Sequence, residues 1–203
     1  GLETSATFDG ENWIIKGEKR WIGMGTIADF ALVWARDTAD QQIKAFIVPT
    51  DTPGYSAEKI SNKIGLRIMQ NAHITLDNVS VPASAHLPDA VNFDAANEML
   101  RNSRAWVGWQ GYGIQIGIFD IVREYATTRE QFGKPLAKFQ LVQKGISEIM
   151  SNAQAALGLM MNCARMQENG TLDMVHAAMA KATATRFARQ SAALGREVLG
   201  GNG

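Results

Sequence analysis

Two arginines are the residues of this chain whose settings best suit chemistry. Arg129 stands where a helix is expected to end, in the segment 129–135 (REQFGKP). A cation at that place is favoured by the helix dipole, by about 0.3–1 kcal/mol, and this structural role is the simpler interpretation. The alternative is a phosphate or pyrophosphate contact, for which a planar guanidinium is well suited.

The second arginine, Arg104, lies beside Trp106 in an otherwise apolar helical stretch that is rich in glycine. Each glycine inside a helix costs about 1 kcal/mol relative to alanine, so the cluster predicts close approach of a neighbouring backbone. The glycines are Gly108, Gly111, Gly113 and Gly117. A charge in such a setting needs a partner. A structural ion pair and a role in a site are both open.

Other motifs for catalysis or metal binding are weak. His73, His86 and His176 are far apart and lie in no metal-ligand spacing, so no metal site is expected. Cys163 is expected to be a small buried hydrophobe on a helix. The segment 200–203 (GGNG) follows a helical pattern rather than opening one, which is typical of a helix C-cap and not of a phosphate loop.

Composition excludes several classes of partner. Lys plus Arg and Asp plus Glu both number 20 in 203 residues, so the chain lacks the basic footprint of nucleic-acid binding. No apolar run reaches the roughly 18 residues of a membrane-spanning helix. The single cysteine excludes an internal disulfide. The compartment stays open: bacterial cytoplasm, peroxisome and mitochondrial matrix all fit.

The first part of the chain, up to about residue 82, has the pattern of an antiparallel sheet. Aromatic and β-branched runs alternate with Gly, Pro, Asp and Asn. Asp9-Gly10 favours a tight turn and predicts a hairpin. The expected strands are 6–8, 13–15, 19–22, 30–35, 45–48, 55–60 and 74–81. The stretch 82–89, with two prolines, resembles a linker.

The second part has the three- and four-residue apolar spacing of helices. We expect helices over 94–127, 136–168 and 172–199, with breaks at Gly133-Lys134-Pro135 and at Asn169-Gly170. Short connections make neighbouring helices antiparallel, as in an up-and-down bundle. The sequence therefore predicts an α+β protein of several domains: a barrel- or sandwich-like β-domain at 1–88 and a helical bundle at 94–203.

Four motifs, in order, resemble the acyl-CoA dehydrogenase family: 19–23 (KRWIG), 129–136 (REQFGKPL), 139–140 (FQ) and 199–203 (LGGNG). The segment 62–67 (NKIGLR), with 70–71 (QN) and 195–197 (GRE), is most similar to the branch that holds plant peroxisomal short-chain acyl-CoA oxidase. That branch is similar to glutaryl-CoA dehydrogenase. The resemblance covers essentially the whole chain.

The resemblance implies a subunit of three parts, of which this chain would lack the N-terminal helical domain and the last helix of the bundle. It implies FAD as cofactor, with Trp21 packed by the flavin ring. Gly23 stands where the family usually has threonine, and we hypothesise that its missing side chain opens a path for dioxygen. The catalytic glutamate would lie downstream of Gly203, so no residue of the chain is predicted to be catalytic. Arg104 matches an arginine near the catalytic pocket, which would support the carboxylate base or its loop.

The resemblance also implies a shared cofactor site in a homodimer or homotetramer. Arg129, Phe132 and Gln140 match residues that hold the FAD of a neighbouring subunit, and Gly201 matches a backbone contact to the same FAD. Glu197 departs from the glutamine of many relatives. A carboxylate accepts hydrogen bonds but does not donate them, so the contact that the glutamine of these relatives makes with the cofactor is in doubt at Glu197.

The reaction implied is α,β-dehydrogenation of an acyl-CoA thioester to a trans-2-enoyl-CoA, as in fatty acid β-oxidation. The electrons would pass to an electron-transfer flavoprotein in a dehydrogenase or to dioxygen in an oxidase. The alternatives are a non-catalytic scaffold of the same family and a flavoprotein similar to nitroalkane oxidase. The chain by itself is expected to be inactive.

Overall fold

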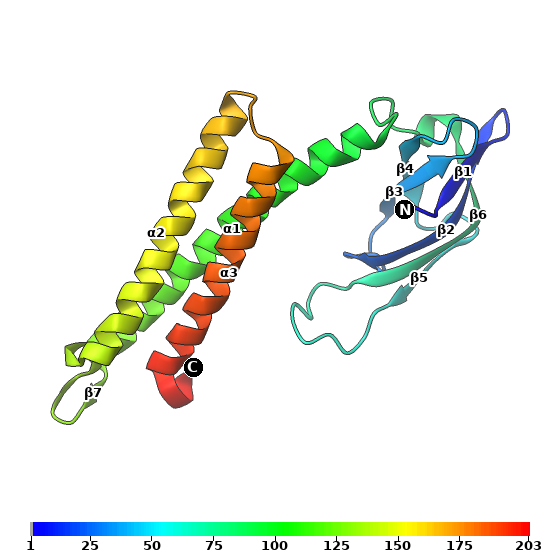
Figure 1. Cartoon of the computed structure of the whole chain (residues 1–203). Helices are drawn as coiled ribbons and strands as arrows, with labels where there is room; N and C mark the ends of the chain where they lie inside the picture. The colour runs from blue at the N-terminus through cyan, green and yellow to red at the C-terminus, as the bar shows by residue number, and fades with distance from the viewer. Residues whose placement is uncertain (1) are drawn as a thin grey trace. The chain divides into compact units, whose positions relative to one another are not determined.

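The computed structural model describes residues 2–203, which form two compact units. The first unit ends at Ala96 and consists mainly of strands, and the second is the helical unit Asn97–Gly203. Figure 1 shows the strands of the first unit in blue to teal and the three long helices of the second in green to red.

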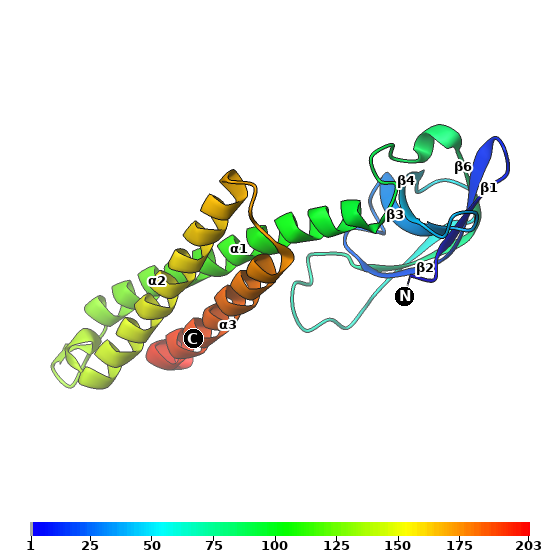
Figure 2. The ribbon, with the colours of Figure 1, turned by 45° about the horizontal axis from the view of Figure 1, so that its top comes forward.

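The β unit is one six-stranded sheet of order β4-β3-β1-β2-β6-β5. Its strands are β1 (Ser5–Phe8), β2 (Asn12–Ile22), β3 (Phe30–Asp37), β4 (Ile43–Pro49), β5 (Tyr55–Lys59) and β6 (Ala72–Pro82). All neighbours are antiparallel except β1 and β3, which run parallel. The sheet curls into a half-barrel (Figure 2), which confirms the predicted barrel-like β-domain, with this one parallel pair as a difference.

The predicted hairpin is confirmed. Phe8 lies opposite Trp13 across the β1–β2 pair. In the turn, the Asp9 carboxylate accepts hydrogen bonds from the backbone N–H groups of Glu11 and Asn12, at 2.9 and 2.7 Å. Gly10 supplies the positive φ of 109° that the turn requires.

The two short strands expected at 13–15 and 19–22 are instead one strand, β2, so the predicted break is wrong. The register shifts between Ile15 and Gly17, where the strand bulges without ending. Gly17 has a φ of 141°, and a Cβ there would lie 2.8 Å from the Cα of Thr4. Glycine therefore marks a bulge and a close backbone approach rather than a turn.

Alternating residues of the strands form the core of the β unit. Trp13, Phe46 and Ile15 are buried, together with Ile74 and Leu76 of β6. The rings of Trp13 and Phe46 pack with centroids 5.1 Å apart. Each such side chain stabilises the fold by about 1.5–3 kcal/mol relative to an exposed position.

Lys19 is the charged residue of β2 whose burial predicts a pH dependence of stability. It lies opposite Ile74, and burial lowers its pKa to about 8 from 10.5. Between these values the unfolded chain binds more protons than the folded chain, so stability rises with pH there. Lys19→Met is expected to raise the free energy of unfolding at pH 7 by about 1 kcal/mol after allowance for solvent screening.

Urea unfolding at pH 7 and pH 10 measures this effect. The variant is expected to lose the rise in stability that the parent shows between the two pH values. Lys16→Met, at an exposed position of the same strand, is the matched control. An equal rise in parent and Lys19→Met would contradict the prediction.

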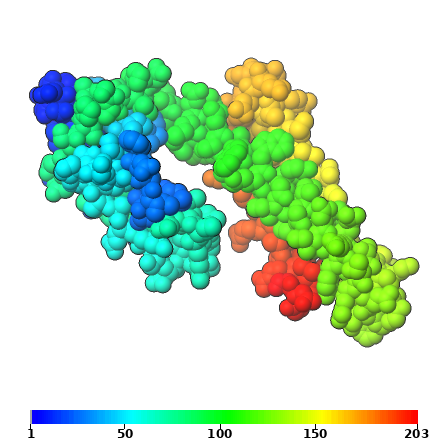
Figure 3. Space-filling model, turned by 180° about the vertical axis from the view of Figure 1, so that it is seen from behind, coloured from blue at the N-terminus to red at the C-terminus, as the bar shows by residue number. Residues whose placement is uncertain are grey.

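The helical unit contains three long helices: α1 (Phe93–Thr128), α2 (Gln140–Glu168) and α3 (Met174–Leu199). Seen from behind, α1 covers the near face of this unit (Figure 3). Short elements complete the chain: the 3-10 turns η1 (Ala83–Ala85), η2 (Leu136–Lys138) and η3 (Gly200–Asn202), and the strands β7 (Glu130–Gln131) and β8 (Lys134–Pro135). The predicted bundle of helices is confirmed.

Two predicted helix starts differ from the structure. The second helix begins at Gln140 and not at 136, because Leu136–Lys138 is a 3-10 turn and Phe139 is extended, with φ −96° and ψ 130°. The third begins at Met174, since Asp173 is its N-cap and accepts a hydrogen bond from the His176 backbone N–H at 2.8 Å. In the expected linker 82–89, η1 forms one helical turn.

The glycines of α1 differ in the atoms that surround them. A Cβ at Gly111 would lie 3.0 Å from a backbone atom of Ala184 in α3, which confirms close backbone approach at that position. At Gly108 the neighbour is a side chain, that of Met160. Gly113 and Gly117 have nothing of the described chain within 4 Å, so the prediction is wrong for them here.

The expected burial of Cys163 is confirmed. Cys163 is 4% exposed and Met160 is fully buried, so both are part of the core. Within residues 2–203 no cluster of three His, Cys, Asp or Glu side chains could hold a metal ion. None of the described helices is long and apolar enough to cross a membrane.

Candidate functional site

Trp21 presents an exposed indole at the end of β2. Its side chain is 57% exposed, and its φ of 63° lies in the left-handed region. That conformation costs a non-glycine residue about 1–2 kcal/mol, so neighbouring contacts must hold it. The Asn71 side-chain amide donates to the Trp21 carbonyl at 3.2 Å. The turn therefore holds a large aromatic ring where a planar ligand could stack on it.

Gly23 follows two residues later, and the Met69 side chain lies next to it. A Cβ at this position would lie 3.3 Å from the sulfur of Met69, which is tight but opposed only by the flexible end of a side chain. Its φ is not in the positive range that excludes other residues. The backbone conformation at this position thus does not require glycine.

A second group of candidate residues lies at one end of the helical unit. Arg129 follows α1 directly, and its backbone N–H donates to the Tyr125 carbonyl at 2.8 Å. The same Tyr125 accepts, at its hydroxyl, a hydrogen bond of 3.1 Å from the side-chain amide of Asn202. Gly201, next to Asn202, is exposed. The structure thus brings Arg129 and Gly201 to the same end of the unit.

Phe132 is the most exposed aromatic ring of this end. It is 92% exposed and occupies the β7–β8 turn with a φ of 53°. The Phe139 ring lies 6.2 Å away, edge on, and the Lys134 ammonium lies 4.3 Å from that second ring. Phe132 therefore presents an aromatic ring outside the core of its own unit.

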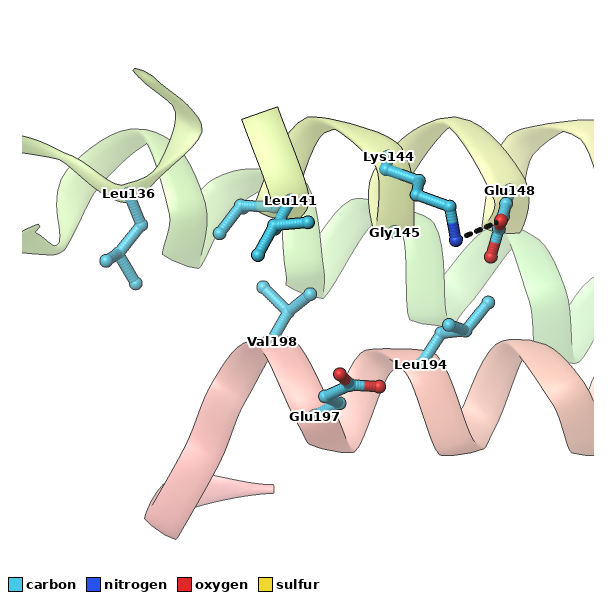
Figure 4. Close-up of a pocket in the computed structure, with 9 residues that line it drawn as sticks. Leu136, Leu141, Lys144, Gly145, Glu148, Leu194, Glu197 and Val198 are labelled. Atoms are coloured by element: carbon cyan, nitrogen blue, oxygen red, sulfur yellow. Dashed lines mark ion pairs between the residues drawn. The ribbon is translucent and has the colours of Figure 1, made fainter. Parts of the chain in front are cut away.

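Gln140 is the exposed first residue of α2, beside a pocket between the start of α2 and the end of α3. The pocket has a volume of about 300 Å³ and is lined by Leu136, Leu141, Val142, Lys144, Gly145, Glu148, Leu194, Glu197 and Val198. Figure 4 shows the ion pair of Lys144 and Glu148, 2.8 Å apart, which faces Glu197. This ion pair raises the pKa of Lys144.

Arg104 has a different setting from Arg129. It is half-buried, and its guanidinium donates to the sulfur of Met174 at 3.0 Å. No carboxylate of the described chain lies within 4.0 Å of it, so the structural ion pair finds no support there. Its role as a support of the catalytic base stays a prediction.

The chemistry of these groups fits FAD. That cofactor joins two planar ring systems by a diphosphate, and Trp21 and Phe132 are among the exposed aromatic rings of the described chain. Arg129 is exposed and has no carboxylate within ion-pair distance among the described residues. Such a guanidinium suits a diphosphate, and the amide of Gln140 can both donate and accept.

Two functional candidates were missed by reasoning from the sequence, Lys63 and Asn71. Both lie in the segments that served only to place the chain within a branch, 62–67 and 70–71. Lys63 contacts residues of its own loop, but Asn71 contacts Trp21, which is distant in the sequence. The register of β2 against β6 brings Asn71 and Trp21 together.

The fold and the side chains together are typical of flavin-dependent dehydrogenases. The model of the acyl-CoA dehydrogenase middle domain matches residues 1–79, and that of the acyl-CoA dehydrogenase C-terminal domain matches residues 93–203. The chain belongs to the acyl-CoA dehydrogenase family.

Relatives agree with this assignment. Cyclohexane-1-carbonyl-CoA dehydrogenase of Syntrophus aciditrophicus is 33% identical over 89% of this chain and 48% of its own length. Human mitochondrial short-chain specific acyl-CoA dehydrogenase is 30% identical, over 98% of this chain and 50% of its own. A glutaryl-CoA dehydrogenase of Mycobacterium smegmatis in complex with FADH2 superimposes with a TM-score of 0.93, at 34% identity, over 99% of this chain and 52% of that one. The chain thus spans about half the length of these relatives.

Proposed function

We propose that the protein to which this chain belongs is an FAD-dependent acyl-CoA dehydrogenase or oxidase. The reaction is α,β-dehydrogenation of an acyl-CoA thioester to a trans-2-enoyl-CoA. The observation that carries the proposal is the exposed, left-handed Trp21 beside Gly23, in a chain whose relatives include a glutaryl-CoA dehydrogenase in complex with FADH2. In this assignment residues 1–88 are the β-domain and 94–203 belong to the helical domain.

The residues of the chain bind and orient in this proposal, and none is assigned as the base. FAD, when bound, supplies the acceptor for the hydride that leaves the β-carbon. Trp21 stacks by the flavin ring and shields one side from water, which strengthens electrostatic interactions in the site. Arg129, Phe132, Gln140 and the backbone of Gly201 would hold the FAD that is bound by a second copy of the chain.

The residues of the helical unit are proposed to act on the FAD of a second copy of the chain. Arg129, between α1 and β7, and Phe132, in the β7–β8 turn, are both exposed. Their side chains are therefore available to a site shared with a second subunit. A homodimer or homotetramer is the expected assembly, and an electron-transfer flavoprotein or dioxygen is the expected acceptor.

The test of the function uses the complete gene product with its flavin. Short-chain acyl-CoAs are added without oxygen while the flavin absorbance is followed, and air is then admitted. Bleaching by an acyl-CoA supports the proposal. A bound flavin that no acyl-CoA bleaches would overturn it for these substrates and favour a scaffold protein.

Gly23→Thr is expected to slow re-oxidation of the reduced enzyme by air if the protein is an oxidase. The added side chain would obstruct the proposed path of dioxygen at Gly23 and requires only a small shift of Met69, whose sulfur would lie 3.3 Å from the Cβ. The expected decrease is about tenfold, the size of a barrier change near 1.4 kcal/mol. Stopped-flow re-oxidation measures it, and Gly23→Ala, which lacks the hydroxyl, separates bulk from hydrogen bonding. Air oxidation as fast as in the parent would contradict the hypothesis that Gly23 opens a path for dioxygen.

A further inference from the structure

The loop between β5 and β6 is folded around one lysine. Lys63 is half-buried in a segment whose other side chains are mostly exposed. Its ammonium donates to the carbonyls of Leu66 and Met69, at 3.0 and 2.5 Å, and to the side-chain oxygen of Asn71, at 2.5 Å. An ammonium has three N–H donors, so every donor of Lys63 is used within the loop.

The same loop has no apolar core that could hold it. Ile64 and Ile68 are 98% and 88% exposed, and Leu66 is 69% exposed in a left-handed conformation with φ 49°. No carboxylate of the described residues pairs with Lys63. The hydrogen bonds of the Lys63 ammonium therefore hold the loop in one conformation, together with the bond of 2.9 Å from the Arg67 guanidinium to the Lys63 carbonyl and the backbone hydrogen bonds of the loop.

The end of the loop contacts the turn that carries Trp21. The Asn71 amide nitrogen donates to the Trp21 carbonyl at 3.2 Å. The adjacent Gln70 accepts a hydrogen bond from the Thr26 hydroxyl at 3.0 Å. The Met69 sulfur lies beside Gly23, at 3.3 Å from the place of a Cβ.

We propose that Lys63, acting through Asn71, is a positioning residue that fixes the backbone of Trp21 and with it the flavin-facing turn. Since the ammonium of Lys63 can only donate, it fixes the oxygen of the Asn71 amide toward itself and the nitrogen toward Trp21. Trp21 needs such a contact because its left-handed conformation is unfavourable for a non-glycine residue. The inference rests on the proposed function and deepens it.

Two variants test the two contacts separately: the contact of Lys63 with Asn71, and the contact of Asn71 with Trp21. Lys63→Met removes all three donors and frees the loop. Asn71→Asp keeps an acceptor for Lys63 but replaces the donor that faces the Trp21 carbonyl. Lys59→Met, an exposed lysine four residues before Lys63, is the matched control. Melting temperatures check that each variant of the complete protein is folded.

Amide hydrogen exchange and FAD binding are measured for each variant. The Met69 N–H donates to the Leu66 carbonyl at 3.1 Å, so its protection reports the loop. We expect Lys63→Met to lose this protection and Asn71→Asp to keep it. Both are expected to bind FAD about tenfold more weakly, as for the loss of a charged or oriented hydrogen bond, and to shift the visible flavin band.

The outcomes are distinct. Weaker FAD binding and a shifted band in both variants, with Lys59→Met like the parent, support the positioning role. Parent-like affinity and spectrum in both variants overturn it, even if the loop loses protection. A parent protein that binds no FAD overturns the proposed function itself, and it is recognised before any variant is compared.

Discussion

Gly54→Ala is expected to lower the free energy of unfolding of the β unit by about 2–5 kcal/mol, the sum of a left-handed backbone penalty and overpacking. Gly54 has a φ of 87°, and a Cβ there would lie 2.2 Å from the carbonyl oxygen of Asp77. The obstacle is backbone rather than a flexible side chain. The Gly54 carbonyl also accepts the Asp77 N–H at 2.9 Å, so the clash cannot be relieved without loss of that hydrogen bond.

Gly10→Ala is the matched control for this experiment. Gly10 has a φ of 109° but no heavy atom within 4 Å of its Cβ position. Its substitution therefore carries only the conformational cost, about 1–2 kcal/mol. Urea unfolding followed by tryptophan fluorescence compares the two variants. Equal losses of stability would show that the close approach of Asp77 contributes nothing.

Arg129→Gln is expected to weaken FAD binding by about 10- to 100-fold, because a hydrogen bond to a charged group contributes about 1.5–3 kcal/mol. The side chain is exposed and has no acidic partner in the described chain, so its charge is available for a diphosphate. Loss of stability is expected to be small, since the Arg129 backbone hydrogen bonds to Tyr125 and Leu136 stay in place. Titration of the apoprotein with FAD measures the affinity.

Arg123→Gln is the control for the arginine substitution. Arg123 is also exposed on α1, and its guanidinium lies 3.8 Å from Asp120 in a surface ion pair. Such pairs contribute about 0–1 kcal/mol, so this variant is expected to bind FAD as the parent does. If both variants lost affinity for FAD to the same degree, general electrostatic attraction would explain the effect. The proposed contact of Arg129 with the diphosphate would then be contradicted.

The sequence by itself determined the two kinds of secondary structure and the family. Runs of aromatic and β-branched residues between Gly, Pro, Asp and Asn predicted the strands. Three- and four-residue spacing of apolar residues predicted the helices, because this period follows from helix geometry. Asp9-Gly10 predicted its hairpin through local turn chemistry, which needs no distant contact. The order of the short motifs carried the family resemblance, which the matched family models confirm.

Only the tertiary structure decided the features that join distant segments. The start of α2 at Gln140 depends on the 3-10 turn before it, whereas helical spacing alone extends the helix to 136. The close packing at Gly111 depends on α3, and the open space at Gly113 and Gly117 has no signature in the spacing of glycines. Trp21, whose φ lies in the left-handed region, and Asn71, which donates to its carbonyl, are 50 residues apart in the sequence. Such contacts form because β2 pairs with β6, and a local pattern contains no information on that register.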